Sequence, residues 1–124
     1  MKLLIVDDSL MDRRLLTRLL QKANVPYPIL EATDGQEALK IVSENYKDIK
    51  LIFLDWQMPN MDGLEFMRGM VKVKDVSHIP IVMVSASGSD ENKKQAYDVN
   101  PKLAGYIVKP FNPETLLNTI KPYL

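Results

Sequence analysis

Five side chains that could do chemistry stand directly after short apolar runs in this sequence. Asp7 and Asp8 follow the first run, Asp55 the third, Ser85 the fourth and Lys109 the fifth. If the fold brings these positions to one edge, their carboxylates crowd together, which is unfavourable unless a cation lies among them. Mg²⁺ suits this set because it prefers oxygen ligands and takes only one or two carboxylates from a protein. The pattern therefore predicts a magnesium site.

A magnesium ion among carboxylates also allows chemistry on a phosphate. The ion would let a phosphoryl group approach an acidic cluster that otherwise repels it, because the ion keeps positions open for phosphoryl oxygens. A carboxylate held beside the ion could then act as a nucleophile and form an acyl phosphate. Lys109 and Ser85 would bind and stabilise the oxygens of the transferred group.

The chain alternates between short apolar runs rich in β-branched residues and longer segments of helical period. Most of the runs are uninterrupted apolar stretches and do not alternate between apolar and polar residues, which is typical of parallel strands buried on both faces. The alternation predicts a doubly wound α/β fold with right-handed crossovers, in which the carboxyl ends of the strands line one crevice. The five predicted strands cover Leu3 to Val6, Ile29 to Ala32, Leu51 to Leu54, Ile81 to Val84, and Tyr106 to Val108.

Capping residues mark the starts of the predicted helices. Ser9, followed three residues later by Asp12, resembles a capping box at the start of the first helix. Asn112-Pro113 predicts the N-cap and first residue of the last helix, which ends at Pro122. The second and third helices are predicted after Asp34-Gly35 and Asp62-Gly63, and the fourth from Asp90 to about Val99.

Composition limits the classes of protein that the sequence can encode. The 124 residues suit one domain, and 16 basic side chains balance 16 acidic ones, so nucleic-acid binding is not expected. The sequence has no Cys, which suits a reducing compartment. The apolar run before Asp7 is too short for a signal peptide or a membrane span. We expect a cytoplasmic monomer of one domain, residues 1–124, without an output domain or membrane contact.

Four segments together resemble one family. Asp7-Asp8, the run from Leu54 to Gly63, Ser85-Ala86, and the run from Gly105 to Phe111 are similar to the signature of response-regulator receiver domains of two-component systems. The resemblance spans the whole chain, and the sequence of residues after Asp55 most resembles that of single-domain chemotaxis members. It implies a five-stranded flavodoxin-like fold with strand order 2-1-3-4-5 and helices on both faces.

The resemblance implies a role for each candidate site residue. Asp55 would be the phosphoacceptor, and Asp8 and Asp55 would bind Mg²⁺ together with the main-chain carbonyl of Gln57. Asp7 would act mainly through metal-bound water. Lys109 would contact the phosphoryl group, and Lys109-Pro110 would be a cis peptide bond, which X-Pro tolerates at about 0.5 to 1 kcal/mol.

The resemblance also implies switch residues and partners. Ser85 would be the switch hydroxyl and Tyr106 the aromatic switch. A sensor histidine kinase of the chemotaxis type would donate the phosphoryl group. The face of the fourth helix, fifth strand and fifth helix would bind a flagellar motor switch protein or another effector, and a phosphatase would be a further partner. The domain would catalyse only its own phosphorylation and dephosphorylation, so we do not expect an enzyme with a separate substrate.

Three features depart from the chemotaxis members. Gln57 stands where they usually have Asn, which affects the expected rate of hydrolysis. Ser85 replaces the commoner Thr and keeps the hydroxyl without the methyl that restrains its rotamer. The segment from Asp98 to Leu103 replaces the usual Ala-Gly turn and lengthens the chain between Ser85 and Lys109, as surface loops tolerate.

Several alternatives stay open on the sequence alone. A haloacid-dehalogenase-like phosphatase would need a second Asp where Gln57 stands, and a flavodoxin-like carrier would need a first loop rich in Ser, Thr and Gly. A receiver that only binds partners, or one that serves another pathway or a phosphorelay, uses the same fold. Ser85 could simply cap the fourth helix, Trp56 could only pack, and His78 is expected at the surface.

Overall fold

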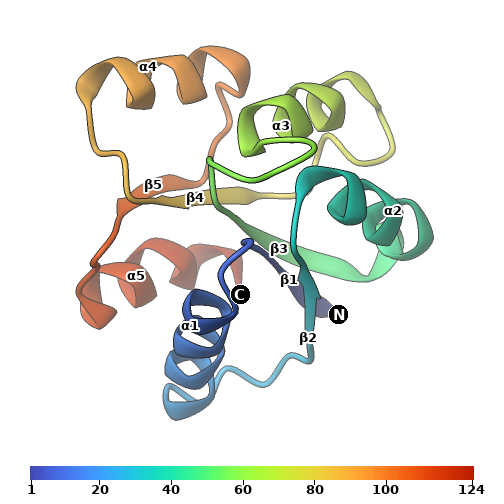
Figure 1. The fold of residues 1–124 in the computed structure, drawn as a ribbon. Coiled ribbons are helices and arrows are strands. Elements are labelled where there is room, and N and C mark those ends of the chain that lie inside the picture. The colour runs from blue at the N-terminus through green and yellow to red at the C-terminus, as the bar shows by residue number, and fades with distance from the viewer.

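The computed structural model describes residues 1–124 and contains one sheet of five parallel strands in the order β2-β1-β3-β4-β5 (Figure 1). The predicted fold class and strand order are therefore confirmed. The strands are β1 (Lys2–Val6), β2 (Ile29–Ala32), β3 (Ile49–Leu54), β4 (Ile81–Ser85) and β5 (Gly105–Val108). The helices are α1 (Leu10–Lys22), α2 (Gly35–Asn45), α3 (Gly63–Lys72), α4 (Asp90–Val99) and α5 (Pro113–Ile120), with short 3₁₀ turns at Tyr46–Asp48 and Lys121–Tyr123.

The helices cover both faces of the sheet. α1 and α5 lie on one face, and α2, α3 and α4 lie on the other (Figure 1). Alternate residues of β1 serve the two sides: Leu3 and Ile5 belong to the core under α1 and α5, and Leu4 and Val6 to the core under the other helices. Because both faces are buried, a continuous apolar run is the pattern that such a strand requires.

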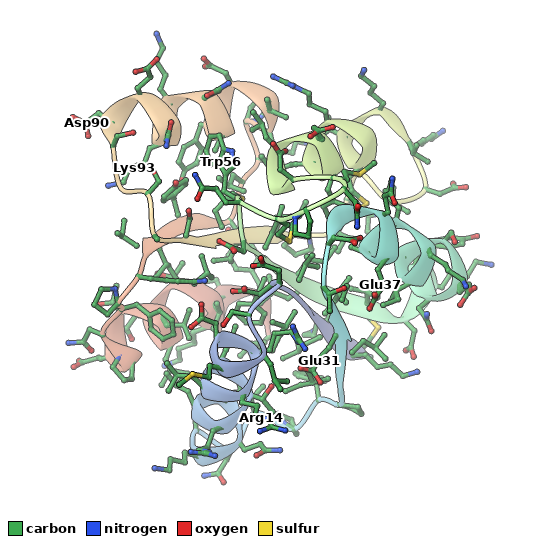
Figure 2. The ribbon with its side chains drawn as sticks, viewed as in Figure 1. Arg14, Glu31, Glu37, Trp56, Asp90 and Lys93 are labelled. Carbon is green, nitrogen blue, oxygen red and sulfur yellow. The ribbon has the colours of Figure 1, made fainter.

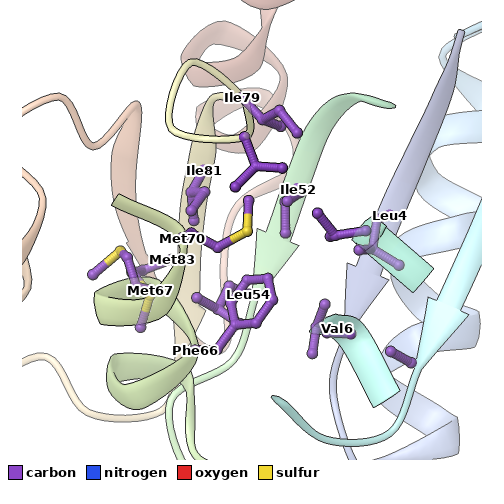
Figure 3. Packing of buried hydrophobic residues seen from close by; sticks show 14 of the residues in the cluster. Leu4, Val6, Ile52, Leu54, Phe66, Met67, Met70, Ile79, Ile81 and Met83 are labelled. Carbon is purple, nitrogen blue, oxygen red and sulfur yellow. The ribbon is translucent and has the colours of Figure 1, made fainter. Parts of the chain in front are cut away.

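The larger core lies between the sheet and α2, α3 and α4, with α3 contributing its largest side chains. Figure 3 shows Phe66 and Met70 of α3 over Leu54 of β3 and Ile81 of β4. Phe66 and Leu54 have no exposed surface, and burying a side chain of this size contributes about 1.5 to 3 kcal/mol. This packing fixes β3, and with it the position of the residues that follow the strand.

The predicted strands are found within two residues of their predicted bounds. The second, Ile29 to Ala32, has the predicted bounds, while β3 begins earlier, at Ile49, which pairs with Lys2 of β1. The predicted starts of α2 and α3 after Asp34 and Asp62 are also confirmed, since each carboxylate accepts a backbone N–H of its helix. Local capping chemistry therefore decides where these helices begin.

Two capping predictions differ from the structure. The side chain of Ser9 does cap α1, accepting the Asp12 N–H at 3.2 Å, but the Asp12 carboxylate does not complete a capping box. The Ser9 N–H donates instead to Asp7 Oδ1 at 2.9 Å, which leaves the Asp12 carboxylate available elsewhere. The alternative that Ser85 caps α4 is wrong, because Ser89 is the N-cap.

None of the helices has both the length and the apolar composition that a membrane span requires.

Candidate functional site

The carboxyl ends of four strands meet at one edge of the sheet. Backbone hydrogen bonds continue past the strand ends: the Asp55 N–H donates to the Val6 carbonyl at 2.9 Å, and the Lys109 N–H donates to the Ser85 carbonyl at 2.8 Å. The Asp7 N–H likewise donates to the Ala32 carbonyl at 3.0 Å. The chemistry-bearing residues are therefore held by the sheet itself and not by free loops.

Three of the predicted residues form an acidic cluster. Asp7, Asp8 and Asp55 each present one carboxylate oxygen, and these oxygens lie within 4.8 Å of one another. Asp7 is buried, Asp55 has a side chain that is 12% exposed, and Asp8 faces solvent. A set of oxygen ligands that is open on one side suits a hard divalent cation that retains water, as Mg²⁺ does.

A hollow of about 360 Å³ opens beside this cluster. Seven of its eight lining residues carry polar side chains, which is the character expected where a charged group binds. The residues that line it are Asp7, Asp8, Asp12, Asp55, Gln57, Ser85, Ala86 and Lys109. The structure thus brings Gln57, Ser85 and Lys109 to the same hollow as the carboxylates.

The Lys109 amine is the positive charge at this site. Its Nζ donates to Asp7 Oδ2 at 2.7 Å and to Asp12 Oδ2 at 2.9 Å, and it lies 3.7 Å from Asp55 Oδ1. Burial works against the charged amine, but the hydrogen bonds to Asp7 and Asp12 hold the pKa of Lys109 above its ordinary value. Lys109 therefore stays charged at neutral pH.

The carboxyl group of Asp55 is harder to ionise than an ordinary Asp. Burial is the main cause and the neighbouring Asp7 charge adds to it, so the pKa of Asp55 is raised from 3.8 to about 6 despite Lys109 nearby. The Trp56 N–H donates to Asp55 Oδ1 at 2.9 Å, which leaves Oδ2 without such a partner. A bound cation would favour the ionised form of this group.

The raised pKa of Asp55 predicts how the stability of the metal-free protein depends on pH. The folded state holds the Asp55 proton more tightly than the unfolded state, so unfolding free energy should rise as pH falls from about 6 toward about 4. Urea unfolding in the presence of a chelator at several pH values measures this change. The rise should be smaller in Asp55→Asn than in the wild type, which isolates the contribution of Asp55 from that of carboxyl groups with lowered pKa values such as Asp34. An identical pH dependence of the two proteins would contradict the raised pKa of Asp55.

The comparison with known sequences decides the family. A family model described as the response regulator receiver domain matches residues 3–121. The chain belongs to the receiver family. The predicted resemblance is thereby confirmed, and the phosphatase and flavodoxin-like alternatives are wrong.

Known receivers match this chain along its whole length. A chemotaxis protein CheY homolog of Campylobacter jejuni is 36% identical over 124 residues, which cover 100% of this chain and 92% of that relative. The structure of CheY4 of Vibrio cholerae has a TM-score of 0.85 and 36% identity, covering 99% of this chain and 98% of that one. The structure of a CheX–CheY–BeF₃–Mg²⁺ complex of Borrelia burgdorferi has a TM-score of 0.85 at 26% identity, with 99% of this chain and 89% of that one covered.

Membership in the receiver family carries general properties. Receivers are typically signalling modules of two-component systems and not enzymes with separate substrates, and the family normally binds Mg²⁺. CheY-like receivers interact with kinases, effectors or phosphatases. The acidic cluster of Asp7, Asp8 and Asp55 lies where this receiver would hold such an ion.

One of the two predicted switch residues of this receiver, Ser85, lines the hollow, and the other, Tyr106, lies on β5 outside its lining. Ser85 is 2% exposed, and its Oγ accepts the Ser87 N–H at 3.2 Å. The half-buried Tyr106 donates its hydroxyl to the Ser87 carbonyl at 2.5 Å. Both side chains are thus tied to the loop between β4 and α4, through which a change at Ser85 could reach Tyr106.

Three further features of this receiver were predicted from the sequence: the packing of Trp56, the exposure of His78 and the cis peptide bond at Lys109–Pro110. Trp56 is half-buried and packs against the larger core, on the side of α3 and α4 (Figure 2). His78 is exposed in the loop before β4, as expected. The Lys109–Pro110 peptide bond is cis, as the resemblance implied.

Two residues of the receiver site were missed by sequence reasoning. Asp12 binds Lys109 across 97 residues of sequence, which no local pattern reveals. Arg13 donates from Nη1 to the Asp7 carbonyl at 2.7 Å and from Nε to Glu31 at 3.0 Å, so it fixes the acidic loop. The only signal was their place in the first turn of a helix that begins beside Asp7 and Asp8.

Proposed function

We propose that this receiver is a phosphorylation-activated response regulator that accepts a phosphoryl group from a histidine kinase on Asp55 in the presence of Mg²⁺. The observation that carries the proposal is the meeting of three carboxylate oxygens within 4.8 Å beside the Lys109 amine. The Borrelia burgdorferi relative, solved in a complex with BeF₃ and Mg²⁺, supports it.

The residues at the site suit the proposed ion. Asp8 and Asp55 would bind Mg²⁺ with the main-chain carbonyl of Gln57. Both oxygens of Asp7 already accept hydrogen bonds, from Ser9 and from Lys109, which supports a role for Asp7 through metal-bound water. When bound, the ion would neutralise the carboxylates and stabilise the charge that develops on the phosphoryl oxygens.

In the proposed reaction, a carboxylate oxygen of Asp55 attacks the phosphorus of a phosphohistidine. The new bond joins that oxygen to phosphorus, the phosphorus–nitrogen bond breaks, and the imidazole leaves with a proton from solvent. The Lys109 amine and the Ser85 hydroxyl bind the oxygens of the transferred group. Water later cleaves the acyl phosphate, so the domain catalyses only reactions of its own side chain.

The proposed signal is a change at the α4, β5 and α5 face. Attraction of Ser85 toward the phosphoryl oxygens would break its contact with the Ser87 N–H and make room for Tyr106 to turn inward. Tyr106 would then leave its bond to the Ser87 carbonyl. A local charge would in this way repack a surface that an effector contacts.

Replacing Ser85 with Ala is expected to uncouple beryllofluoride binding at Asp55 from the change at the α4, β5 and α5 face. The variant should still bind beryllofluoride with Mg²⁺, but at least half of the induced NMR shifts in α4 and β5 should be lost, because the attracted hydroxyl is missing. Ser77→Ala, in an exposed loop, is the matched control. Full wild-type shifts in Ser85→Ala would eliminate Ser85 as the switch.

We further propose that the protein acts as a single receiver over residues 1–124 in chemotaxis, as a cytoplasmic monomer. The match to 92% of a CheY homolog supports this reading. Its partners would be a chemotaxis-type histidine kinase, a flagellar motor switch protein or other effector at the α4, β5 and α5 face, and a phosphatase. Another two-component pathway or a phosphorelay is the alternative, which the choice of kinase in a phosphotransfer assay would distinguish.

The proposed function is tested with a small-molecule phosphodonor. Incubation with acetyl phosphate and Mg²⁺ should add one phosphoryl mass to the intact protein, and borohydride trapping should place it on Asp55. Omitting Mg²⁺ or using Asp55→Asn should prevent the addition. If the wild type gains no phosphoryl mass while a known receiver in the same mixture does, the chain is a partner-binding module that is not phosphorylated.

A further inference from the structure

The carboxylate of Asp12, in the first turn of α1, accepts a hydrogen bond from Lys109. Lys109 Nζ lies 2.9 Å from Asp12 Oδ2 and 2.7 Å from Asp7 Oδ2, and both are hydrogen bonds. The distance from Nζ to Asp55 Oδ1 is 3.7 Å, which is an ion pair without a hydrogen bond. The amine is therefore held toward Asp7 and Asp12, away from the proposed nucleophile.

Nothing else in the structure needs the Asp12 carboxylate at this place. Ser9 caps α1 through the Asp12 N–H, which any residue supplies, and the Ser9 N–H is already bound to Asp7. Asp12 is outside the cluster of possible metal ligands, and its side chain is 41% exposed. Its carboxylate is thus free to act on Lys109 alone.

A lysine amine has three N–H groups, and two of them are committed here. On phosphorylation the amine must reach oxygens beyond Asp55, so the bond to Asp12 competes with the bond to the phosphoryl group. Hydrogen bonds between charged groups are the stronger kind, and partial exposure weakens this one by solvent screening. The competition therefore has a measurable but moderate effect.

We propose that Asp12 is a positioning residue that holds the Lys109 amine away from Asp55 until a phosphoryl group draws it across. The inference rests on the proposed function, because it assigns Asp12 to the regulation of the same site. Asp12 lowers the affinity of the site for a phosphoryl group, and thereby biases the protein toward its unphosphorylated state.

The test is a beryllofluoride titration at saturating Mg²⁺ on wild type, Asp12→Asn, Lys109→Gln and the double variant. Asp12→Asn should bind beryllofluoride about twofold to fivefold more tightly than wild type, as expected when a partly exposed bond to a charged carboxylate is replaced by a bond to a neutral amide. The same change in the Lys109→Gln background should have no effect. Equal or weaker binding of beryllofluoride by Asp12→Asn would overturn the inference. The same tightening in the Lys109→Gln background would also overturn it, because the effect would then come from repulsion between the Asp12 carboxylate and the bound anion and not from Lys109.

A second readout does not depend on the Lys109 variant. In Asp12→Asn with Mg²⁺ and no beryllofluoride, the side-chain NMR signal of Lys109 should lie part of the way toward its beryllofluoride-bound position. An unmoved signal would refute positioning by Asp12. A wild type that binds no beryllofluoride would overturn the proposed function and this inference together, whereas a responsive wild type with an unchanged Asp12→Asn would overturn this inference alone.

Discussion

Asp55→Asn is expected to abolish phosphoryl transfer and, at pH 7 without metal, to stabilise the fold by about 1 to 3 kcal/mol. The first effect follows because the amide oxygen is not a nucleophile that can form an acyl phosphate. The second follows because burial and the Asp7 charge raise the pKa of Asp55 to about 6, which makes its ionised form costly in the folded state. Removing the charge removes that cost.

The stability of Asp55→Asn is measured by urea unfolding at pH 7 in a chelator. Asp75→Asn is a suitable control, since Asp75 is exposed and changes of such residues are usually within about 0.5 kcal/mol of neutral. Mg²⁺ should stabilise the wild type more than it stabilises Asp55→Asn, because the variant lacks one of the proposed ligands. Destabilisation by Asp55→Asn without metal would contradict the picture of repelling carboxylates.

Gly63→Ala is expected to destabilise the protein by about 2 to 4 kcal/mol and to weaken the site at the same time. A Cβ at Gly63 would lie 2.2 Å from the carbonyl oxygen of Asp55, so the backbone of the proposed phosphoacceptor would have to move. The Gly63 N–H also donates to the Trp56 carbonyl at 2.8 Å, and that bond would be disturbed. Lower unfolding free energy and weaker beryllofluoride binding should appear together.

Gly69→Ala is the matched control for Gly63→Ala. Gly69 lies inside the same helix, α3, and a Cβ there would meet only the Leu39 side chain, at 4.0 Å. Replacing a helical Gly with Ala at an open position stabilises by about 0.5 to 1 kcal/mol. If both variants were equally destabilised, the cause would lie in α3 as a whole and not in the close approach of Gly63 to Asp55.

Much of the fold could be predicted because the signals are local. Continuous apolar runs predicted the five strands. Asp34 and Asp62 are helix N-caps, and the carboxylate of each accepts the backbone N–H of the residue three positions later. The site could be located because parallel strands place their carboxyl ends at one edge. The positions of Asp55 and Lys109 near one another thus follow from the fold.

Other features could not be predicted because they depend on contacts between distant segments. The spacing of Ser9 and Asp12 fits a capping box as well as it fits a bond to Lys109, and only the tertiary structure shows the latter. The closeness of Gly63 to the Asp55 carbonyl depends on the path of the loop after β3. Neither has a signature in composition or periodicity.

The most direct test of the proposed Asp55 site is a titration followed by Trp56 fluorescence. Trp56 is the only tryptophan, and its backbone N–H donates to the Asp55 carboxylate at 2.9 Å. We predict a saturable change with Mg²⁺, then a second, Mg²⁺-dependent change with beryllofluoride that is absent in Asp55→Asn. No change with either ligand, in fluorescence and in NMR shifts alike, would contradict a phosphorylatable magnesium site and leave a receiver that only binds partners.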